Sequence, residues 1–335
     1  MRHNTLKDIA KKLKLSASTV SRALSNHPDI SAQTKEKVKT LAQKLNYSPN
    51  PIAQSLKNNR TTTIGVIVPE IKHDFFSTAI SGIEDIAYES GYTIILCQSN
   101  ESFEREIVNT NALMHHRVAG VIVSISQQTS TGDHFKTLID RGIPVVFFDR
   151  VCEDVDANKI IIDDEKSAFI AVQHLINKGY KKIAHFAGPQ ELDVCKKRLN
   201  GYLTALKSAG CTREQEMIYL GGMHETDGYS CMDNLINSQN IPDSVFCIND
   251  PVAIGAYQRI QEAGLRIPDD IGIVGFSNNK ITTLVNPQLT TVDQPSFEMG
   301  KKAAEILIDI IENPNKKNQF KTIVLNSSLI ARGST

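Results

Sequence analysis

The sequence contains no tryptophan, no long apolar run and only six cysteines in 335 residues. No stretch approaches the roughly 18 apolar residues that a membrane-spanning helix requires, and no basic segment followed by an apolar run opens the chain. We therefore expect a soluble protein with no membrane partner that stays in the cytoplasm. The cysteines are scattered and none has Cys-x-x-Cys spacing, which predicts free thiols in a reducing compartment.

Motifs for catalysis and nucleotide binding are also missing. No Gly-x-Gly-x-x-Gly follows the apolar run Ile64–Val68, and neither a Gly-x-x-x-x-Gly-Lys-Ser/Thr loop nor a Gly-x-Ser-x-Gly elbow occurs. His224-Glu225 begins a zinc-protease pattern, but Gly228 occupies the position of the second histidine. We therefore expect no enzyme activity, no cofactor and no metal.

The charge of the chain is balanced overall but divided unevenly along it. Lys and Arg together number 37, as do Asp and Glu. Residues 1–60 nevertheless hold 12 basic and 3 acidic side chains, a formal charge of +9, which leaves −9 on the remainder. A basic segment of this size is what neutralisation of DNA phosphates requires.

Three short amphipathic helices are predicted within this basic segment. Leu6, Ile9, Ala10 and Leu13 recur at helical spacing after Thr5, a good N-cap. A second helix starts after Ser16, with Val20, Ala23 and Leu24 on one face, and a third follows Ser31, with Val38, Leu41, Ala42 and Leu45 repeating. The tight connection Lys14–Ser16 between the first two helices predicts a helix-turn-helix that reads DNA.

The outward face of the second helix carries the candidate DNA readers. Ala17, Ser18, Ser21 and Arg22 point away from its apolar face or lie near its start. An arginine can donate two hydrogen bonds to O6 and N7 of a guanine. Short polar side chains suited to phosphate oxygens surround it: Ser16, Ser18, Thr19, Ser31 and Thr34. Each of these also has a plain structural explanation as a helix cap or a solvated position.

The segment between Tyr47 and Arg60 is predicted to be a linker with a conditional helix. Asn50 can cap it, Pro51 suits the first helical position, and about two turns are too short to be stable alone. Ile52, Ala53 and Leu56 would form its apolar face. Leu56 would wedge between base steps in a minor groove, or the face would pack on the rest of the protein.

From Thr62 onward, continuous apolar strands alternate with amphipathic helices, which predicts two lobes built on parallel α/β sheets. Strands are expected at 64–68, 92–96, 120–123, 144–148, 159–162, 182–186, 218–220, 244–248, 271–275, 289–292 and 322–325. Helices are expected at 75–90, 102–116, 133–141, 165–178, 197–209, 226–237, 251–263 and 297–311.

Polar and aromatic residues follow the carboxyl ends of these strands, where open α/β sheets bind ligands. We expect eleven of these residues to form the effector site: His73, Phe75, Phe76, Ser124, Asp149, Arg150, Arg198, Asn249, Asp250, Ser277 and Gln294. Asp74, Ser99 and Ser126 also follow strand ends but are not included in the expected site. Carboxylates and amides bind hydroxyl groups, and aromatic faces stack on rings, so a cleft lined this way suits a small hydroxylated ligand. Alternatively, individual members such as Asp250 cap the following helix.

Specific runs of residues give the chain a family resemblance. They are Thr5-Leu-x-Asp-Ile-Ala10, Ser16-x-Ser-Thr-Val-Ser-Arg-Ala-Leu24, Leu45-Asn-Tyr-x-Pro-Asn50 with Ala53 and Leu56, Thr63-Ile-Gly-Val-Ile-Val-Pro69, Arg198-x-x-Gly-Tyr202, Asn249-Asp250, Val274-Gly-Phe276 and Leu289-Thr-Thr-Val-x-Gln-Pro295. Over essentially its whole length the chain resembles the LacI/GalR family of bacterial transcription regulators.

The resemblance implies an architecture and a partner. Residues 1–48 would be a helix-turn-helix domain, 49–60 a hinge helix, and 61–335 a body like a type I periplasmic binding protein. Its first lobe would span about 61–160 plus 292–325 and its second about 161–291, with three crossovers. The protein would be a homodimer that reads a pseudo-palindromic operator in double-stranded DNA, under the control of a small-molecule effector, sugar-like or a related metabolite, held between the lobes.

The resemblance also assigns roles to residues. Ala17, Ser18 and Arg22 would meet bases; Thr5, Ser16, Thr19, Ser31, Thr34 and Tyr47 would hold the DNA backbone; Asn50, Ala53 and Leu56 would form the hinge. His73, Phe75, Phe76, Asp149, Arg198, Asn249 and the residue after Phe276 would meet the effector. That last residue is Ser277, where many relatives carry Asp, so a carboxylate that grips two sugar hydroxyls is missing.

Our leading hypothesis is therefore a dimeric, effector-controlled transcription regulator, a repressor rather than an activator. A small-molecule binding protein that has lost sequence-specific DNA reading is the alternative. An enzyme built on the same two-lobed body is a third hypothesis, which no set of residues supports.

Overall fold

The computed structural model describes residues 5–45, 47, 61–211, 217–315 and 319–335. It divides into two compact units, Met1–Thr61 and Thr62–Thr335, which we call the head and the body and describe separately. No described helix is both long enough and apolar enough to cross a lipid bilayer.

The head consists of three helices around one small core. They are α1 (Leu6–Leu13), α2 (Ala17–Leu24) and α3 (Ala32–Lys44). Their buried side chains are Ile9, Ala10, Val20, Ala23, Val38 and Ala42. Lys14 ends α1 in the left-handed region, with φ of 51°, which turns the chain directly into α2. The predicted helix-turn-helix is therefore confirmed.

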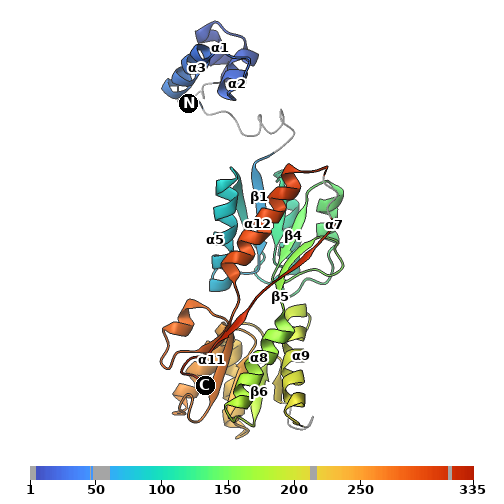
Figure 1. Ribbon diagram of the computed structural model, residues 1–335, viewed down its shortest axis with the longest axis vertical. Helices are drawn as coiled ribbons and strands as arrows, with labels where there is room; N and C mark the ends of the chain where they lie inside the picture. The colour runs from blue at the N-terminus through green and yellow to red at the C-terminus, as the bar shows by residue number, and fades with distance from the viewer. Residues whose placement is uncertain (1–4, 46, 48–60, 212–216, 316–318) are drawn as a thin grey trace. The chain divides into compact units, whose positions relative to one another are not determined.

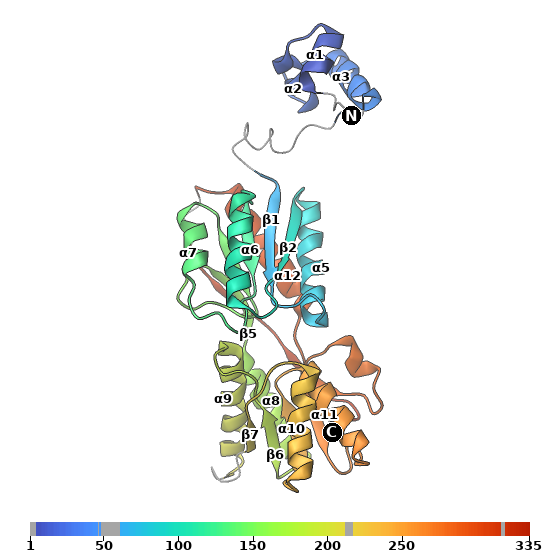
Figure 2. The same ribbon diagram turned by 180° about the vertical axis from the view of Figure 1, so that it is seen from behind.

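The first lobe of the body contains a parallel sheet in the order β11-β5-β4-β3-β1-β2. Its strands are β1 (Thr63–Val68), β2 (Thr93–Gln98), β3 (Gly120–Val123), β4 (Val145–Phe148), β5 (Asn158–Ile162) and β11 (Thr322–Leu325). Figure 1 shows α5 (Asp74–Glu89) and α12 (Ser296–Glu312) on one face. Figure 2 shows α6 (Phe103–His115) and α7 (Asp133–Asp140) on the other.

Glycines allow α5 and α12 to approach each other closely. A Cβ at Gly300 would lie 2.0 Å from the carbonyl oxygen of Ala79, and one at Gly82 would lie 2.1 Å from that of Phe297. Apolar side chains of both helices pack on β1 in one core. Leu113 of α6 and Phe135 of α7 belong to a second core on the opposite face of the sheet.

The second lobe repeats this arrangement with the order β12-β10-β9-β8-β6-β7. Its strands are β6 (Ile183–Phe186), β7 (Met217–Tyr219), β8 (Ser244–Cys247), β9 (Gly272–Ser277), β10 (Thr290–Asp293) and β12 (Ser328–Ile330). The helices are α8 (Asp164–Asn177), α9 (Asp193–Ser208), α10 (Glu225–Asn237), α11 (Asp250–Glu262) and the short 3-10 helix η2 (Lys280–Thr283). The two-lobed α/β body with parallel sheets is therefore confirmed.

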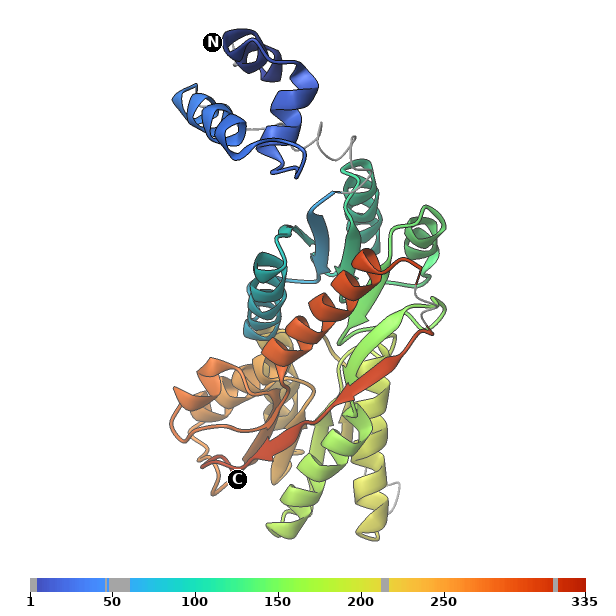
Figure 3. The same cartoon turned by 45° about the horizontal axis from the view of Figure 1, so that its top comes forward.

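The chain crosses between the lobes three times, after β5, β10 and β11 (Figure 3). The last crossing produces a strand that the sequence did not predict. Both β10 and β11 end at the boundary between the lobes. After β11 the chain continues away from this boundary into the second lobe, so β12 runs antiparallel to β10. The second sheet is therefore parallel except for its β12 edge.

Candidate functional site

The second helix of the head exposes the side chains that we expected to read bases. Ala17, Ser18 and Arg22 are all solvent-exposed on α2, while Val20 and Ala23 are buried in the head core. An exposed guanidinium on the outer face of a short helix has the reach and the donor pattern for a guanine edge. The structure therefore leaves these three side chains available to a major groove.

Three of the six residues expected to hold the DNA backbone, namely Thr5, Ser16 and Ser31, are helix N-caps. Ser16 Oγ accepts a hydrogen bond from Thr19 N at 3.0 Å and lies 2.8 Å from both Ser18 Oγ and Thr19 Oγ1. The same pattern occurs at Ser31, whose Oγ accepts from Thr34 N at 3.3 Å and lies 2.9 Å from Thr34 Oγ1. These hydroxyls hold the first turns of α2 and α3 in place, where helix N-termini present N–H groups to anions.

Thr5 and Tyr47 flank the three helices of the head. Thr5 donates from its backbone N–H and from its hydroxyl to Asp8 Oδ2, at 2.8 Å and 2.7 Å. Tyr47 packs against the head core, and burial raises the pKa of its phenol. Asn50, Ala53 and Leu56, with the predicted hinge helix, lie outside the described residues.

A cavity lies between the two lobes of the body. It has about 490 Å³ of space free of protein atoms, part of it open to solvent. Nine of the eleven expected effector residues line it, namely His73, Phe75, Phe76, Asp149, Arg150, Arg198, Asn249, Ser277 and Gln294. Both lobes contribute, so a ligand here would contact the two lobes at once.

Two expected effector residues, Ser124 and Asp250, do not line this cavity, and for them the prediction is corrected. Ser124 is fully buried at the end of β3. Asp250 is fully buried as well, and its carboxylate accepts hydrogen bonds from Asn279 N at 2.7 Å and from Thr291 Oγ1 at 2.6 Å. Asp250 therefore fixes the loop after β9 to the start of α11. Asp250 does not cap α11 either, because Asn249 is the N-cap and its side chain accepts from Val252 N.

The cavity also contains residues that the sequence analysis missed. They are Glu101, Val194, Met223, Pro251 and Asn279. Glu101 stands in the turn after β2, so the strand-end rule that selected Ser99 could have found it. Met223 lies between β7 and α10 and offered no such signal, because an isolated methionine in a loop is not distinctive.

Arg198 is the most firmly held cation of the cavity wall. Its Nε and Nη2 each lie 2.8 Å from Asp164 Oδ1, and its Nη1 donates to the carbonyl of Ile248 at 2.7 Å. The guanidinium carbon lies 3.7 Å from the centroid of the Phe276 ring. An arginine fixed on so many sides presents its remaining surface to a ligand with little loss of side-chain entropy.

Arg150 forms a second charged anchor, which connects the lobes. Its Nη1 lies 2.9 Å from both carboxylate oxygens of Glu101, and its Nη2 lies 3.3 Å from Met223 Sδ of the second lobe. Arg150 and Glu101 are both buried. Glu101 therefore compensates the positive charge of Arg150 within the first lobe, whereas the contact of Arg150 with the Met223 sulfur depends on the position of the second lobe.

Asp149 is the cavity carboxylate with oxygen atoms still able to bind a ligand, because Glu101 is paired with Arg150. Gln294 Nε2 lies 3.4 Å from its Oδ1, and Gln294 in turn accepts a hydrogen bond from Ser277 Oγ at 2.8 Å. Burial raises the pKa of Asp149 to about 6, against the attraction of Arg150 and Arg198. A carboxyl group of this kind can accept from a ligand hydroxyl or donate to a ligand carbonyl, according to its protonation.

Comparison with known proteins identifies both units. Residues 5–50 match the family described as bacterial regulatory proteins, lacI family, and residues 61–330 match periplasmic binding proteins and sugar binding domain of LacI family. The HTH-type transcriptional repressor PurR of Vibrio atlanticus (strain LGP32) is 35% identical over 98% of each chain. The chain belongs to the LacI family.

Solved structures of LacI-family proteins agree in fold. The Lac repressor dimer bound to operator and the anti-inducer ONPF is 26% identical over 99% of each chain, with a TM-score of 0.87. A LacI family regulator from Enterococcus faecium with bound ribose is 31% identical, covers 82% of this chain and 98% of its own, and has a TM-score of 0.73. The predicted family and fold are therefore confirmed.

Ser277, where the family resemblance led us to expect Asp, gives the cavity wall a hydroxyl in place of a carboxylate. The hydroxyl of Ser277 is engaged with Gln294, and Asn278 beside it donates to Asp293 Oδ1 at 2.8 Å. Neither residue adds a negative charge to the cavity. This side of the cavity therefore presents neutral amide and hydroxyl groups, and Asp149 adds a carboxylate to the lining.

Proposed function

We propose that this LacI-family regulator is a dimeric transcriptional repressor that binds a pseudo-palindromic operator and responds to a small effector in the interlobe cavity. The observation that carries the proposal is the combination of two surfaces in one chain. One is the exposed face of α2 with Ala17, Ser18 and Arg22, and the other is a charged cavity with contributions from both lobes of the body. It acts in the bacterial cytoplasm, where its DNA lies.

The head would bind DNA in two ways. Arg22 and the exposed start of α2 read base edges, while the capped N-termini of α2 and α3 and the many lysines neutralise phosphates. Thr5, Ser16, Thr19, Ser31, Thr34 and Tyr47 contribute to the second role. A twofold dimer places two such helices on two half-sites of one operator, which explains why the operator should be a palindrome.

The body would bind a small polar metabolite with hydroxyl groups. Phe75 and Phe76 supply aromatic surface, Arg198 and Asn249 supply fixed donors, and Asp149 supplies an acceptor. Asn249 is itself held, because its Nδ2 donates to the Met223 carbonyl at 2.9 Å and its Oδ1 accepts from Val252 N at 2.9 Å. Sugars fit this set, and so do other ring compounds with hydroxyl and carbonyl groups.

Communication between the two sites would run through the hinge at Asn50, Ala53 and Leu56. A ligand that contacts both lobes changes their relative position, and the hinge translates that change into the spacing of the two heads of the dimer. By thermodynamic linkage, an effector that releases DNA binds more weakly to the DNA-bound form.

A selection from random duplex DNA at physiological salt tests this function. The purified full-length protein should enrich a palindrome, and the genes beside the genomic copies of that palindrome would narrow the choice of effector. A parallel selection with the Arg22→Ala variant is the matched control, because it should lose preference at one position of each half-site. Enrichment of no sequence, with ligand binding retained, would favour the binding-protein alternative.

A further inference from the structure

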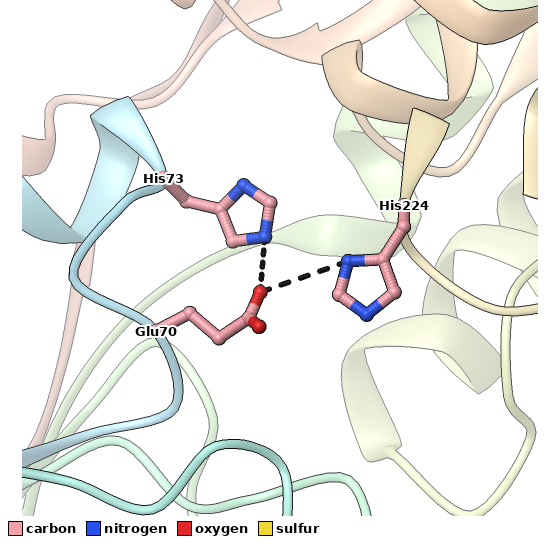
Figure 4. Close-up of side chains that lie close together, drawn as sticks. All are labelled: Glu70, His73 and His224. Carbon is pink, nitrogen blue, oxygen red and sulfur yellow. Dashed lines mark ion pairs between the residues drawn. The ribbon is translucent and has the colours of Figure 1, made fainter. Parts of the chain in front are cut away.

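Three side chains with metal-binding chemistry converge at the boundary of the lobes (Figure 4). Glu70 follows β1, and His73 stands immediately before α5, so both belong to the first lobe. His224 precedes α10 in the second lobe. One donor atom from each lies within 4.8 Å of the other two.

The contacts among these side chains leave one buried nitrogen unsatisfied. Glu70 Oε2 lies 2.6 Å from His73 Nε2 and 3.6 Å from His224 Nδ1, and the two imidazole rings stack with centroids 5.7 Å apart. Glu70 Oε2 is therefore already paired with His73, whereas His224 Nδ1 is buried without a hydrogen-bond partner among the described residues. A buried polar atom is rarely left in this condition, so His224 Nδ1, which faces the Glu70 carboxylate, calls for a further partner.

A cation is the partner that this donor set favours. An imidazole nitrogen that carries no proton can ligate a metal. Two imidazole nitrogens and one carboxylate oxygen are typical ligands of first-row transition metals, whereas Mg²⁺ and Ca²⁺ prefer oxygen alone. Glu225, exposed beside His224, adds negative charge near the cluster.

We propose that Glu70, His73 and His224 bind a transition-metal dication of the Zn²⁺ class, which joins the two lobes at the edge of the effector cavity. The site was not apparent in the sequence because only Glu70 and His73 are close along the chain, and the third ligand, His224, meets them only through the packing of the lobes.

The dimensions require small adjustments. Zinc bonds of about 2.0–2.2 Å in tetrahedral geometry place donor atoms about 3.3–3.6 Å apart. The distance from Glu70 to His224 already fits, whereas Glu70 and His73 must separate by about 1 Å. Lys72 Nζ lies 3.4 Å from the other oxygen of Glu70, but its side chain is 64% exposed and can turn into solvent.

The three protein ligands leave a fourth coordination position, as in catalytic zinc sites. His73 also lines the effector cavity, so that position can take a water or an oxygen or nitrogen atom of the effector. A metal that requires both lobes stabilises their present arrangement. If the effector requires the same arrangement, metal and effector strengthen each other's binding by linkage, a consequence that rests on the proposed function.

Metal titration of the full-length protein, stripped with a chelator and free of any affinity tag, tests the site. Competition against a chromophoric chelator gives the Zn²⁺ affinity, and Co²⁺ substitution reports the ligand types through its visible spectrum. The variants are Glu70→Gln and His224→Asn, one in each lobe and each close to its parent in size. The control is the double variant His115→Asn with His116→Asn, which removes two adjacent exposed histidines at the end of α6.

We expect one Zn²⁺ per chain and a Co²⁺ spectrum without thiolate charge-transfer bands. Glu70→Gln and His224→Asn should each weaken binding by more than ~10-fold, because the loss of even an outer-shell partner costs roughly 10–100-fold. The control should bind as the parent does. Circular dichroism establishes that each variant is folded before titration.

Unchanged affinity in both ligand variants would overturn the proposal. So would loss of binding in the histidine control, or a thiolate band that places the metal at a cysteine. None of these measurements involves DNA, so failure of the metal site leaves the operator selection untouched, and failure of the selection leaves the metal titration interpretable.

Discussion

Arg198 and Asp164 form a buried ion pair in which two nitrogens of the guanidinium each lie 2.8 Å from one carboxylate oxygen. The side chains are only 3% and 5% exposed. Burial raises the pKa of Asp164 even though Arg198 attracts its charge, which indicates that desolvation is the larger effect. The pair therefore positions Arg198 in the cavity wall at a desolvation cost that only an intact partner offsets.

Replacing Asp164 by alanine should destabilise the body strongly, because it leaves Arg198 charged and buried without its counter-ion. We expect the free energy of unfolding to fall by about 3–5 kcal/mol. Urea denaturation followed by circular dichroism measures the change. The matched control is Glu305→Ala, which breaks a half-exposed pair with Lys302 on α12 and should cost under ~1 kcal/mol. Equal losses in both variants would show that Arg198 does not depend on Asp164.

Most of the fold was predictable because its signals are local. The continuous apolar runs at Ile64–Val68 and Gly120–Val123 lie within β1 and β3, and the caps Ser16 and Ser31 start α2 and α3 where expected. The edge strand β12 was not predictable in this way. Its three residues carry no alternation long enough to read, and its direction is decided by where β11 ends.

The cavity was predictable in outline and less so in detail. Strand ends identify the correct edge of a parallel sheet, but they do not say which way a polar side chain turns after the strand. Asn249 faces the cavity, whereas the adjacent Asp250 turns inward to Thr291. The sequence analysis passed over Glu70 and considered His224 only as the start of a zinc-protease pattern, because only the packing of the two lobes brings these side chains together.

Arg22→Ala tests direct readout by the head. The variant should lose about 1–3 kcal/mol of binding free energy at one base position of each half-site, because a bidentate contact to guanine is lost. Binding to random DNA should stay nearly unchanged. Fluorescence anisotropy with the selected operator and single-base variants of it measures the effect.

Lys39→Ala serves as the comparison for Arg22, since Lys39 is an exposed cation on α3 outside the reading helix. It should change affinity equally for all sequences or not at all. Uniform weakening by Arg22→Ala across all sequences would mean that Arg22 only touches phosphate.

Ala53→Pro tests the proposed hinge, which lies outside the described residues. Proline in the interior of a helix removes a hydrogen bond and clashes with the preceding turn, at a cost of about 3 kcal/mol or more. Specific operator binding should disappear, while dimerisation, measured by analytical ultracentrifugation, and effector binding stay intact. Ala53→Gly, which lowers helix stability by only about 1 kcal/mol, should show an intermediate loss. Full operator affinity in the proline variant would remove the folding hinge from the proposed function.

Asp149→Asn tests the protonation of the cavity. Because burial raises the pKa of Asp149 to about 6 from an ordinary 3.8, the folded chain holds a proton there that the unfolded chain has lost over this range. The contribution of Asp149 to stability is therefore greatest below about pH 4 and falls as the pH rises to about 6. The asparagine variant should not lose stability in this way. Its thermal unfolding midpoint should therefore rise relative to that of the parent as the pH increases from about 4 to about 6.

Other buried groups titrate nearby, so the comparison must be between parent and variant. Asp250, with a pKa raised by burial to about 6, acts in the same direction as Asp149. His185, with a pKa lowered by burial to about 4, acts in the opposite one, since its contribution is lost as the pH falls below about 6.5. Both are common to the two proteins and cancel in the difference of their melting curves. Parallel pH profiles would therefore mean that Asp149 is ionised throughout and meets the effector only as a hydrogen-bond acceptor.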